Sequence, residues 1–172
     1  MEYKASFDTL TKTISLIVAI VFAFVAINSV TILCNANKSS VILLHIFILL
    51  SLIATMLVCY LYSTDKYYIG STELIIKRPI GEREILISDI TEIRLVEEDE
   101  LNGLIRTFGS GGLFGYFGKF YNSRFGFITL YTTQLKNRVF IRTKSGKKII
   151  ISPDDVSIVD KLKALLSIDK TI

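Results

Sequence analysis

The sequence predicts an α-helical transmembrane hairpin followed by one mainly-β domain that ends in a single helix. Of its 172 residues, 51% are apolar, and the mean hydropathy of +0.50 is too high for a domain surrounded by water. Asp, Glu, Lys and Arg are absent from residues 13–37 and 39–64. The rest of the chain alternates short β-rich stretches with turn residues, and helical periodicity returns only near its end.

The first span is predicted from Ile14 to Cys34 and the second from Val41 to Tyr62. At 1.5 Å per residue each helix would be about 31 to 33 Å long, which matches a hydrocarbon core of about 30 Å. A secretory signal is the competing interpretation, but the first run is longer than a signal core and a second span follows directly. We therefore expect an N-terminal segment and hairpin in residues 1–62 and one domain in residues 63–172.

The link between the spans has six residues, Asn35 to Ser40, so the spans are expected to be antiparallel neighbours. The N-terminus and the domain would then lie on the same side of the membrane. The link contains Lys38 alone, whereas that common side is flanked by Lys4, Lys12, Lys66, Lys77 and Arg78. Because positive charges favour the cytoplasmic side, we predict that both termini are cytoplasmic.

Asn28 and His45 are strongly polar side chains well inside the predicted spans, at a similar depth. We hypothesise a hydrogen bond between them that joins the two membrane helices. A proton relay is the alternative, but it would require a longer chain of ionisable groups.

The scarce residue types argue against catalysis. His45 is the only histidine and lies in a predicted span, so a triad with a serine or cysteine nucleophile cannot form in the domain. Cys34 and Cys59 should lie near opposite membrane faces, too far apart for a disulfide, and familiar zinc-binding spacings are absent. The acidic run at 97–100 is interpreted as a solvated loop. We expect no enzyme activity, catalytic residue, metal site or cofactor.

Short β-rich stretches separated by turn residues predict strands after the second span. Seven are expected, at residues 66–69, 73–78, 83–87, 91–96, 126–131, 138–144 and 147–151. Tight connections such as Pro79–Glu82 and Ser145-Gly146 favour antiparallel pairing. A helix is then expected to begin with Ser152 as its cap and to run to about Leu166, with an apolar face that covers an open end of the sheet.

Four parts of the domain are similar to a known family: residues 68–69 with 73–79, residues 87–90, residues 108–118 and residues 151–155. Over about Lys66 to Leu166 the chain resembles the bacterial PH (pleckstrin-homology-like) domain proteins with two N-terminal transmembrane helices. The resemblance implies a PH-like barrel of seven antiparallel strands with a C-terminal capping helix. It also implies a location in the bacterial cytoplasmic (inner) membrane and a binding or scaffolding role without catalysis.

Two features limit what the resemblance implies about ligands. Eukaryotic PH domains hold inositol phosphates with basic residues around the first hairpin loop, but here that loop is Gly70–Thr72 and contains none. Phosphoinositide binding is therefore not expected. The glycine-rich run at 108–120 fits neither a Walker motif nor a dinucleotide fingerprint. It is either a structural Ω-type loop packed on the barrel or a flexible loop that inserts Leu113, Phe114 and Phe117 into a membrane or a partner's groove.

No acidic residue occurs from Leu101 to Pro153, whereas nine basic residues do. A domain held beside an anionic leaflet would gain about 1 kcal/mol for each well-placed cation. A solvated basic face without a ligand is the alternative. The candidates for contact with lipid or a partner are Arg106, Leu113, Phe114, Phe117, Lys119, Arg124, Lys136, Arg138, Arg142, Lys144, Lys147 and Lys148.

We predict a membrane-anchored, non-enzymatic PH-like module that binds an anionic lipid surface or a partner protein and acts as a scaffold. The alternative is a homo-oligomerising membrane assembly protein that uses the glycine-aromatic loop or an exposed edge strand. Membrane lipids and a protein partner or a second copy are thus the expected partners. Nucleic acid is not expected, because no recognised module with base-stacking aromatic residues is evident.

Overall fold

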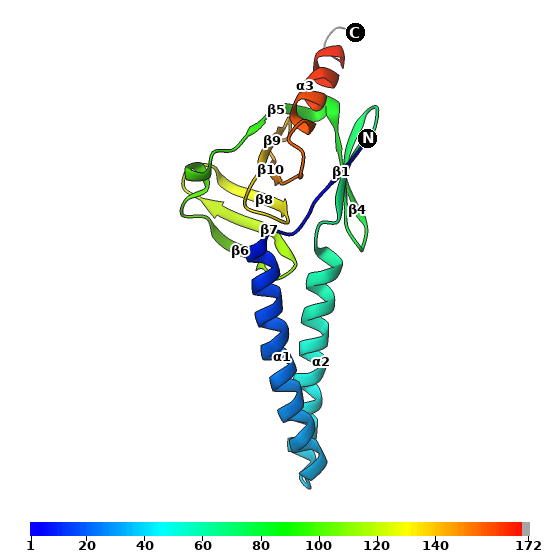
Figure 1. Cartoon of the computed structure of the whole chain (residues 1–172), viewed down its shortest axis with the longest axis vertical. Helices are drawn as coiled ribbons and strands as arrows, with labels where there is room; N and C mark the ends of the chain where they lie inside the picture. The colour runs from blue at the N-terminus through cyan, green and yellow to red at the C-terminus, as the bar shows by residue number, and fades with distance from the viewer. Residues whose placement is uncertain (170–172) are drawn as a thin grey trace.

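Two long antiparallel helices and a β-rich domain make up the computed structural model, which describes residues 1–169 (Figure 1). Helix α1 spans Thr9–Asn35 and helix α2 spans Ser39–Tyr62, so both predicted runs are confirmed as helices. Helix α1 begins earlier than predicted because Asp8 caps it, its side chain accepting a hydrogen bond from Thr11 N at 2.7 Å.

Most apolar side chains of α1 and α2 are not covered by other parts of the chain. Phe24 and Phe47 are 68% and 69% exposed, and the most apolar windows of the two helices are 6% and 0% buried. A core helix of a water-soluble domain would bury such side chains. By length, composition and exposure, the two helices are therefore suited to span a membrane.

Polar side chains within the hairpin bond to their own helix. Asn28 Nδ2 donates to Phe24 O at 2.8 Å, and His45 Nδ1 lies 3.0 Å from Val41 O. The hydrogen bond that the sequence suggested between Asn28 and His45 is thus not formed. A carbonyl one turn back is within reach of each side chain, so neither needs the other helix to satisfy its polar group.

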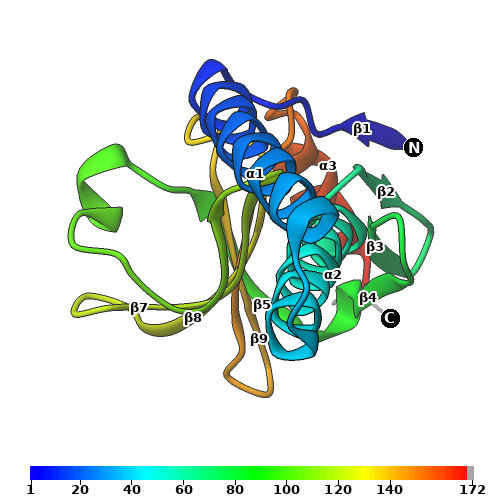
Figure 2. The same ribbon diagram turned by 90° about the horizontal axis from the view of Figure 1, so that it is seen from below.

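The domain contains two sheets, which lie to either side of the helix pair when seen along the helices from below (Figure 2). One sheet has the order β1-β2-β3-β4 and the other β5-β9-β10-β8-β7-β6. The strands are β1 Glu2–Lys4, β2 Lys66–Ile69, β3 Glu73–Lys77, β4 Glu82–Leu86, β5 Ile90–Leu95, β6 Ile105–Gly112, β7 Gly115–Asn122, β8 Gly126–Thr132, β9 Val139–Thr143 and β10 Lys148–Ile151. Short 3₁₀ helices, η1 (Ile87–Asp89) and η2 (Glu98–Leu101), flank β5.

The predicted seven-stranded antiparallel barrel is wrong, although all seven predicted strands are present. The two sheets do not close, and β8 pairs with β10 in parallel. Strand β10 lies between β8 and β9. The second strand of the β9–β10 hairpin, and not the first, therefore pairs with β8. Three strands were not predicted: β1, which adds to the edge of β2, and β6 and β7, which form from the glycine-rich run.

The hydrophobic core lies on both faces of the six-stranded sheet. One cluster fills the space between the two sheets and helix α3 and includes Leu74, Ile141 and Ile158. The other lies on the opposite face and includes Phe120 and Phe140. The adjacent residues Phe140 and Ile141 therefore face different clusters, as in a central strand covered on both sides.

Helix α3 spans Ile158–Asp169 and begins later than predicted. The expected cap, Ser152, is instead fully buried: its Oγ accepts from Thr133 N at 2.9 Å and its N–H donates to Tyr67 Oη at 3.0 Å. Burial raises the pKa of Tyr67, so this hydroxyl stays protonated. Ser152 thus joins three strands of the core, and the chain needs several more residues before it can turn into the helix.

Both membrane-type helices are joined closely to the domain. Strand β1 precedes α1 and pairs with β2, which follows α2, so that Tyr3 lies opposite Tyr67. Residues 63–65 alone separate α2 from β2, and Ile80 N donates to Leu61 O at 3.1 Å. The helix pair and the sheet of β1 to β4 are therefore connected by backbone hydrogen bonds.

Candidate functional site

The glycine-rich run forms the β6–β7 hairpin, and its turn contacts the domain ends of α1 and α2 (Figure 1). Ser15 Oγ accepts from Phe114 N at 3.0 Å and donates to Gly112 O at 3.4 Å. The ring of Phe114 meets that of Tyr60 edge-on, with centroids 5.9 Å apart. The turn is therefore fixed to both helices, close to the predicted edge of the membrane.

Two glycines show why this run can form such a hairpin. A Cβ on Gly112, which has φ +135°, would lie 2.7 Å from Ile14 Cδ1. A Cβ on Gly118, at φ +109°, would lie 2.3 Å from Phe108 O on the neighbouring strand. The backbone contact leaves no room for a Cβ at Gly118, and at Gly112 the positive φ and the contact with Ile14 both disfavour a larger residue. The run is thus neither an Ω-loop nor a freely inserting loop, and of the three apolar candidates Leu113 and Phe114 are half-buried and Phe117 is buried.

A cavity of about 1160 Å³ lies between the start of α1, the β6–β7 hairpin and the loop at 134–138. Residues from the second core cluster, among them Phe120 and Leu101, form part of its wall. Its basic lining residues are Lys12, Arg106, Lys136 and Arg138. They come from three separate parts of the fold: Lys12 from α1, Arg106 from β6, and Lys136 and Arg138 from the loop between β8 and β9.

Asp8 is the one acidic residue among those lining the cavity, and both of its carboxylate oxygens already accept hydrogen bonds. Oδ1 accepts from Thr11 N at 2.7 Å, and Oδ2 accepts from Leu135 N at 3.0 Å. Asp8 thus caps α1 and fixes the 134–138 loop against it. With four basic residues and one engaged carboxylate, the lining has an excess of positive charge that suits an anionic ligand.

Tyr116 is one of the residues that line the cavity, and its hydroxyl is buried beneath that lining. Its Oη makes no well-formed hydrogen bond within residues 1–169, and the Thr11 hydroxyl is a neighbouring polar group. Burial, with Asp8 nearby, raises the pKa of Tyr116, which keeps the phenol protonated and able to donate. A buried polar group of this kind gains from a bonding partner supplied by a ligand or water.

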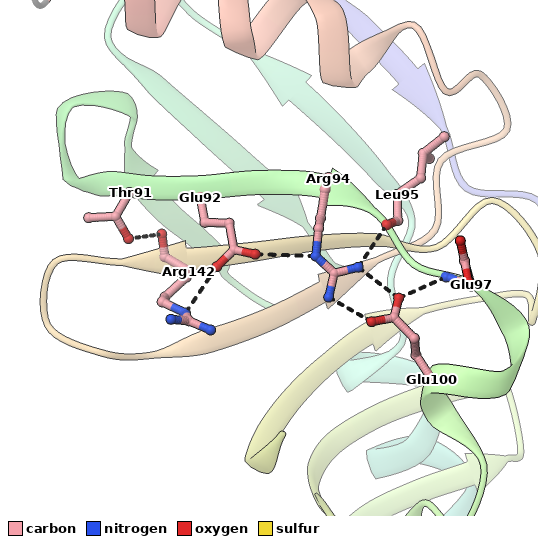
Figure 3. A network of polar contacts seen from close by, with 7 residues as sticks. All are labelled: Thr91, Glu92, Arg94, Leu95, Glu97, Glu100 and Arg142. Atoms are coloured by element: carbon pink, nitrogen blue, oxygen red, sulfur yellow. Dashed lines mark hydrogen bonds and ion pairs between the residues drawn. The ribbon is translucent and has the colours of Figure 1, made fainter. Parts of the chain in front are cut away.

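An ion-pair network holds η2, whose last residue, Leu101, lines the cavity (Figure 3). Arg94 donates from Nη1 and Nη2 to the two carboxylate oxygens of Glu100, at 2.7 and 2.8 Å, and from Nε to Glu92 Oε1 at 3.2 Å. Glu100 also accepts from Glu97 N at 3.0 Å. The bonds from Arg94 lower the pKa of Glu100 to about 2. The prediction of a solvated acidic loop is therefore wrong at Glu100, which is 9% exposed.

The structure separates the remaining predicted basic residues from the cavity. Arg142 Nε lies 3.3 Å from Glu92 Oε2, Arg124 Nη1 lies 3.9 Å from Asp99 Oδ2, and Lys148 Nζ donates to Phe125 O. Exposed positions away from the cavity lining are occupied by Lys119, Lys144 and Lys147.

Arg106, Lys136 and Arg138 are thus the predicted basic candidates that meet at one site. Lys12 was missed, because its position before the first span suggested only a role in membrane orientation. Lys12 lies one turn after the start of α1. This position could have identified it, because the first turn of α1 contacts the domain.

Comparison with known proteins agrees with the resemblance seen in the sequence. A family described as bacterial PH domain matches residues 65–166. Neither the curated proteins nor the solved structures gave a match. The matched range contains Arg106, Lys136 and Arg138, whereas Asp8 and Lys12 precede it. The cavity is therefore built jointly by the matched domain and by the first turns of α1.

Proposed function

The chain belongs to the bacterial PH domain family, and on that premise we propose that it is a membrane-anchored, non-enzymatic binding module whose basic cavity holds an anionic lipid headgroup. PH domains are generally binding modules rather than enzymes, so the family favours recognition over catalysis. The convergence of Lys12, Arg106, Lys136 and Arg138 on one cavity is the observation that carries the proposal.

The position of the cavity supports a lipid rather than a soluble anion. In the proposed arrangement α1 and α2 cross the bacterial cytoplasmic membrane, and the domain lies on the cytoplasmic side, which the flanking lysines favour. Lys12 then lies two residues before Ile14, where the hydrocarbon layer is predicted to begin. The cavity is consequently at the level of the lipid headgroups.

The chemistry of the lining suits a phosphate. Arg106 offers a planar guanidinium group that can donate two parallel hydrogen bonds to one phosphate, and Lys12, Lys136 and Arg138 add positive charge to the lining. Each well-placed cation near an anionic leaflet contributes about 1 kcal/mol.

The test is lipid binding by the full chain purified in neutral detergent, with phosphatidylglycerol compared with phosphatidylcholine by native mass spectrometry. The double variant Arg106→Gln, Lys136→Gln should lose about 2 kcal/mol of phosphatidylglycerol binding, roughly 30-fold in affinity. The matched control Lys144→Gln, Lys147→Gln removes the same charge away from the cavity and should bind normally. Equal losses in both variants, or no preference for the anionic lipid, would refute the proposal.

Self-assembly is a second candidate, favoured by the exposed edge of the six-stranded sheet. Strand β6 is that edge, and Ile105 and Phe108 on it are 63% and 76% exposed. The glycine-aromatic turn is already engaged by α1 and α2, so this candidate depends on the edge alone. Oligomers that persist without lipid and disappear in Phe108→Ser would favour assembly over lipid binding.

A further inference from the structure

An apolar groove lies below the turn of the β6–β7 hairpin, between α1 and α2, and encloses about 540 Å³. Its lining has almost no polar surface within the described residues. Small residues on α1 leave room for it, and larger side chains on α2 form its floor. The residues that define it are Phe22, Ala23 and Ala26 of α1, Ile53 and Met56 of α2, and Phe114 of the turn.

The groove and the basic cavity are aligned on one side of α1. Lys12 lines the cavity and Ala23 lines the groove, and a separation of 11 residues brings two side chains to nearly the same face of a helix. The hairpin turn lies between the two spaces, because Gly111 lines the cavity and Phe114 lines the groove. Ser15, which bonds to this turn, lies between Lys12 and Ala23 along the helix.

The length of the groove matches one leaflet. Along α2 its lining runs from Leu49 to Tyr60, which corresponds to about 16 Å at 1.5 Å per residue. Half of a hydrocarbon core of about 30 Å is about 15 Å. The groove therefore begins at the predicted membrane edge and ends near the middle of the bilayer, where an acyl chain from the domain-side leaflet also ends.

We propose that the cavity and the groove together hold one anionic phospholipid lengthwise, with its headgroup beside Lys12 and Arg106 and one acyl chain under Phe114 between the helices. The headgroup part rests on the proposed function, and the acyl-chain part goes beyond it. The occupant is a lipid rather than a helix of a second copy, because this groove extends over one leaflet only and the basic cavity lies on the same side of α1, beyond the hairpin turn.

The test uses the absence of tryptophan from the sequence, which makes a single introduced tryptophan a clean reporter. Ile53→Trp places the reporter at the rim of the groove, where the residue is 64% exposed and need not fill the space. Ile20→Trp is the control, at a similar depth on α1, 60% exposed and outside the groove. The full chain with either change is reconstituted in phosphatidylcholine vesicles that contain a minor fraction of a lipid brominated on its acyl chains.

Brominated phosphatidylglycerol should quench the tryptophan fluorescence of the Ile53→Trp variant several-fold more strongly than brominated phosphatidylcholine does. The fluorescence of the Ile20→Trp variant should be quenched equally by both lipids. Adding Lys12→Gln and Arg106→Gln should abolish the preference at Ile53→Trp. Adding Ala26→Leu, which narrows the groove, should abolish it too while phosphatidylglycerol binding in detergent persists.

Two outcomes would overturn the inference, and they differ from each other. The chain in detergent could bind phosphatidylglycerol preferentially while the two brominated lipids quench the Ile53→Trp variant equally, as they do the Ile20→Trp variant. The acyl-chain site would then be refuted and the headgroup site would stand. If neither assay prefers the anionic lipid, the proposed function fails and the inference fails with it.

Discussion

Basic residues are used in opposite ways in two regions of this domain. In the network beside β5, Arg94 is bonded to Glu100 and Glu92 and also lies over the rings of Phe125 and Phe140. At the cavity, Lys12, Arg106 and Lys136 make no ion pair within residues 1–169, and the nearby Asp8 is engaged by backbone N–H groups. The network holds its charges within the fold, whereas these three cavity cations form no such pair and, under the proposed function, face a ligand. Pairing, and not the number of cations, distinguishes the two regions.

The largest expected effect comes from breaking the network at its centre. Arg94→Met removes both bonds to Glu100, which is 9% exposed, and leaves a largely buried carboxylate without its partner. We expect a loss of about 3 kcal/mol in the free energy of unfolding, at the low end for buried pairs because Arg94 is partly exposed. Denaturant unfolding of the full chain in detergent would measure it. The control Arg142→Met removes an exposed pair with Glu92 and should cost less than about 1 kcal/mol.

A pH titration tests the same ion pair by neutralising Glu100 instead of replacing Arg94. The pKa of Glu100 is about 2 in the folded chain, below the 4.5 of an unperturbed glutamate, so its bonds stabilise the fold fully above pH 4.5. This contribution should be lost as the pH falls from 4.5 toward 2, by about 2 kcal/mol after allowance for the exposure of Arg94. Thermal unfolding of Glu100→Gln should lack this part of the acid sensitivity. An unchanged acid profile in the variant would contradict the assignment.

The smallest effect on stability is expected at the cavity, and it sharpens the contrast with the network. Arg106→Gln should change the free energy of unfolding by no more than about 0.5 kcal/mol in lipid-free detergent, because it removes no ion pair within the described residues. Added phosphatidylglycerol should raise the melting temperature of the original chain more than that of the variant. This difference should shrink at high salt, which screens exposed charges. A large loss of stability without lipid would instead assign Arg106 to the structural network.

The sequence predicted elements whose own residues specify them. The two apolar helices and the seven strands follow from composition, alternation and turn residues, and all are present. Strands β6 and β7 were missed because glycine disfavours a strand by propensity, while here it permits the close approach of Gly118 to Phe108. Strand β1 has three residues and becomes a strand only through pairing with β2. The parallel pairing of β8 with β10 depends on which strand of the β9–β10 hairpin lies next to β8. The turn residues of that hairpin do not determine this choice.

The candidate site was predicted in part for a similar reason. The absence of acidic residues from 101–153 identified Arg106, Lys136 and Arg138 as candidates together with six others. Which of them meet depends on the curvature of the six-stranded sheet and on where the start of α1 contacts it. Lys12 could be assigned to the cavity only after that contact was known.

The close connection between the helix pair and the β1–β4 sheet has a mechanical consequence. Because the chain enters α1 from β1 and leaves α2 into β2, and these two strands pair, the β1–β4 sheet is joined to the domain-side ends of both helices. Helices of fixed length tilt when the surrounding bilayer becomes thinner or thicker. A tilt of the helix pair would therefore be passed to the β1–β4 sheet through the β1–β2 pairing and the bond from Ile80 N to Leu61 O.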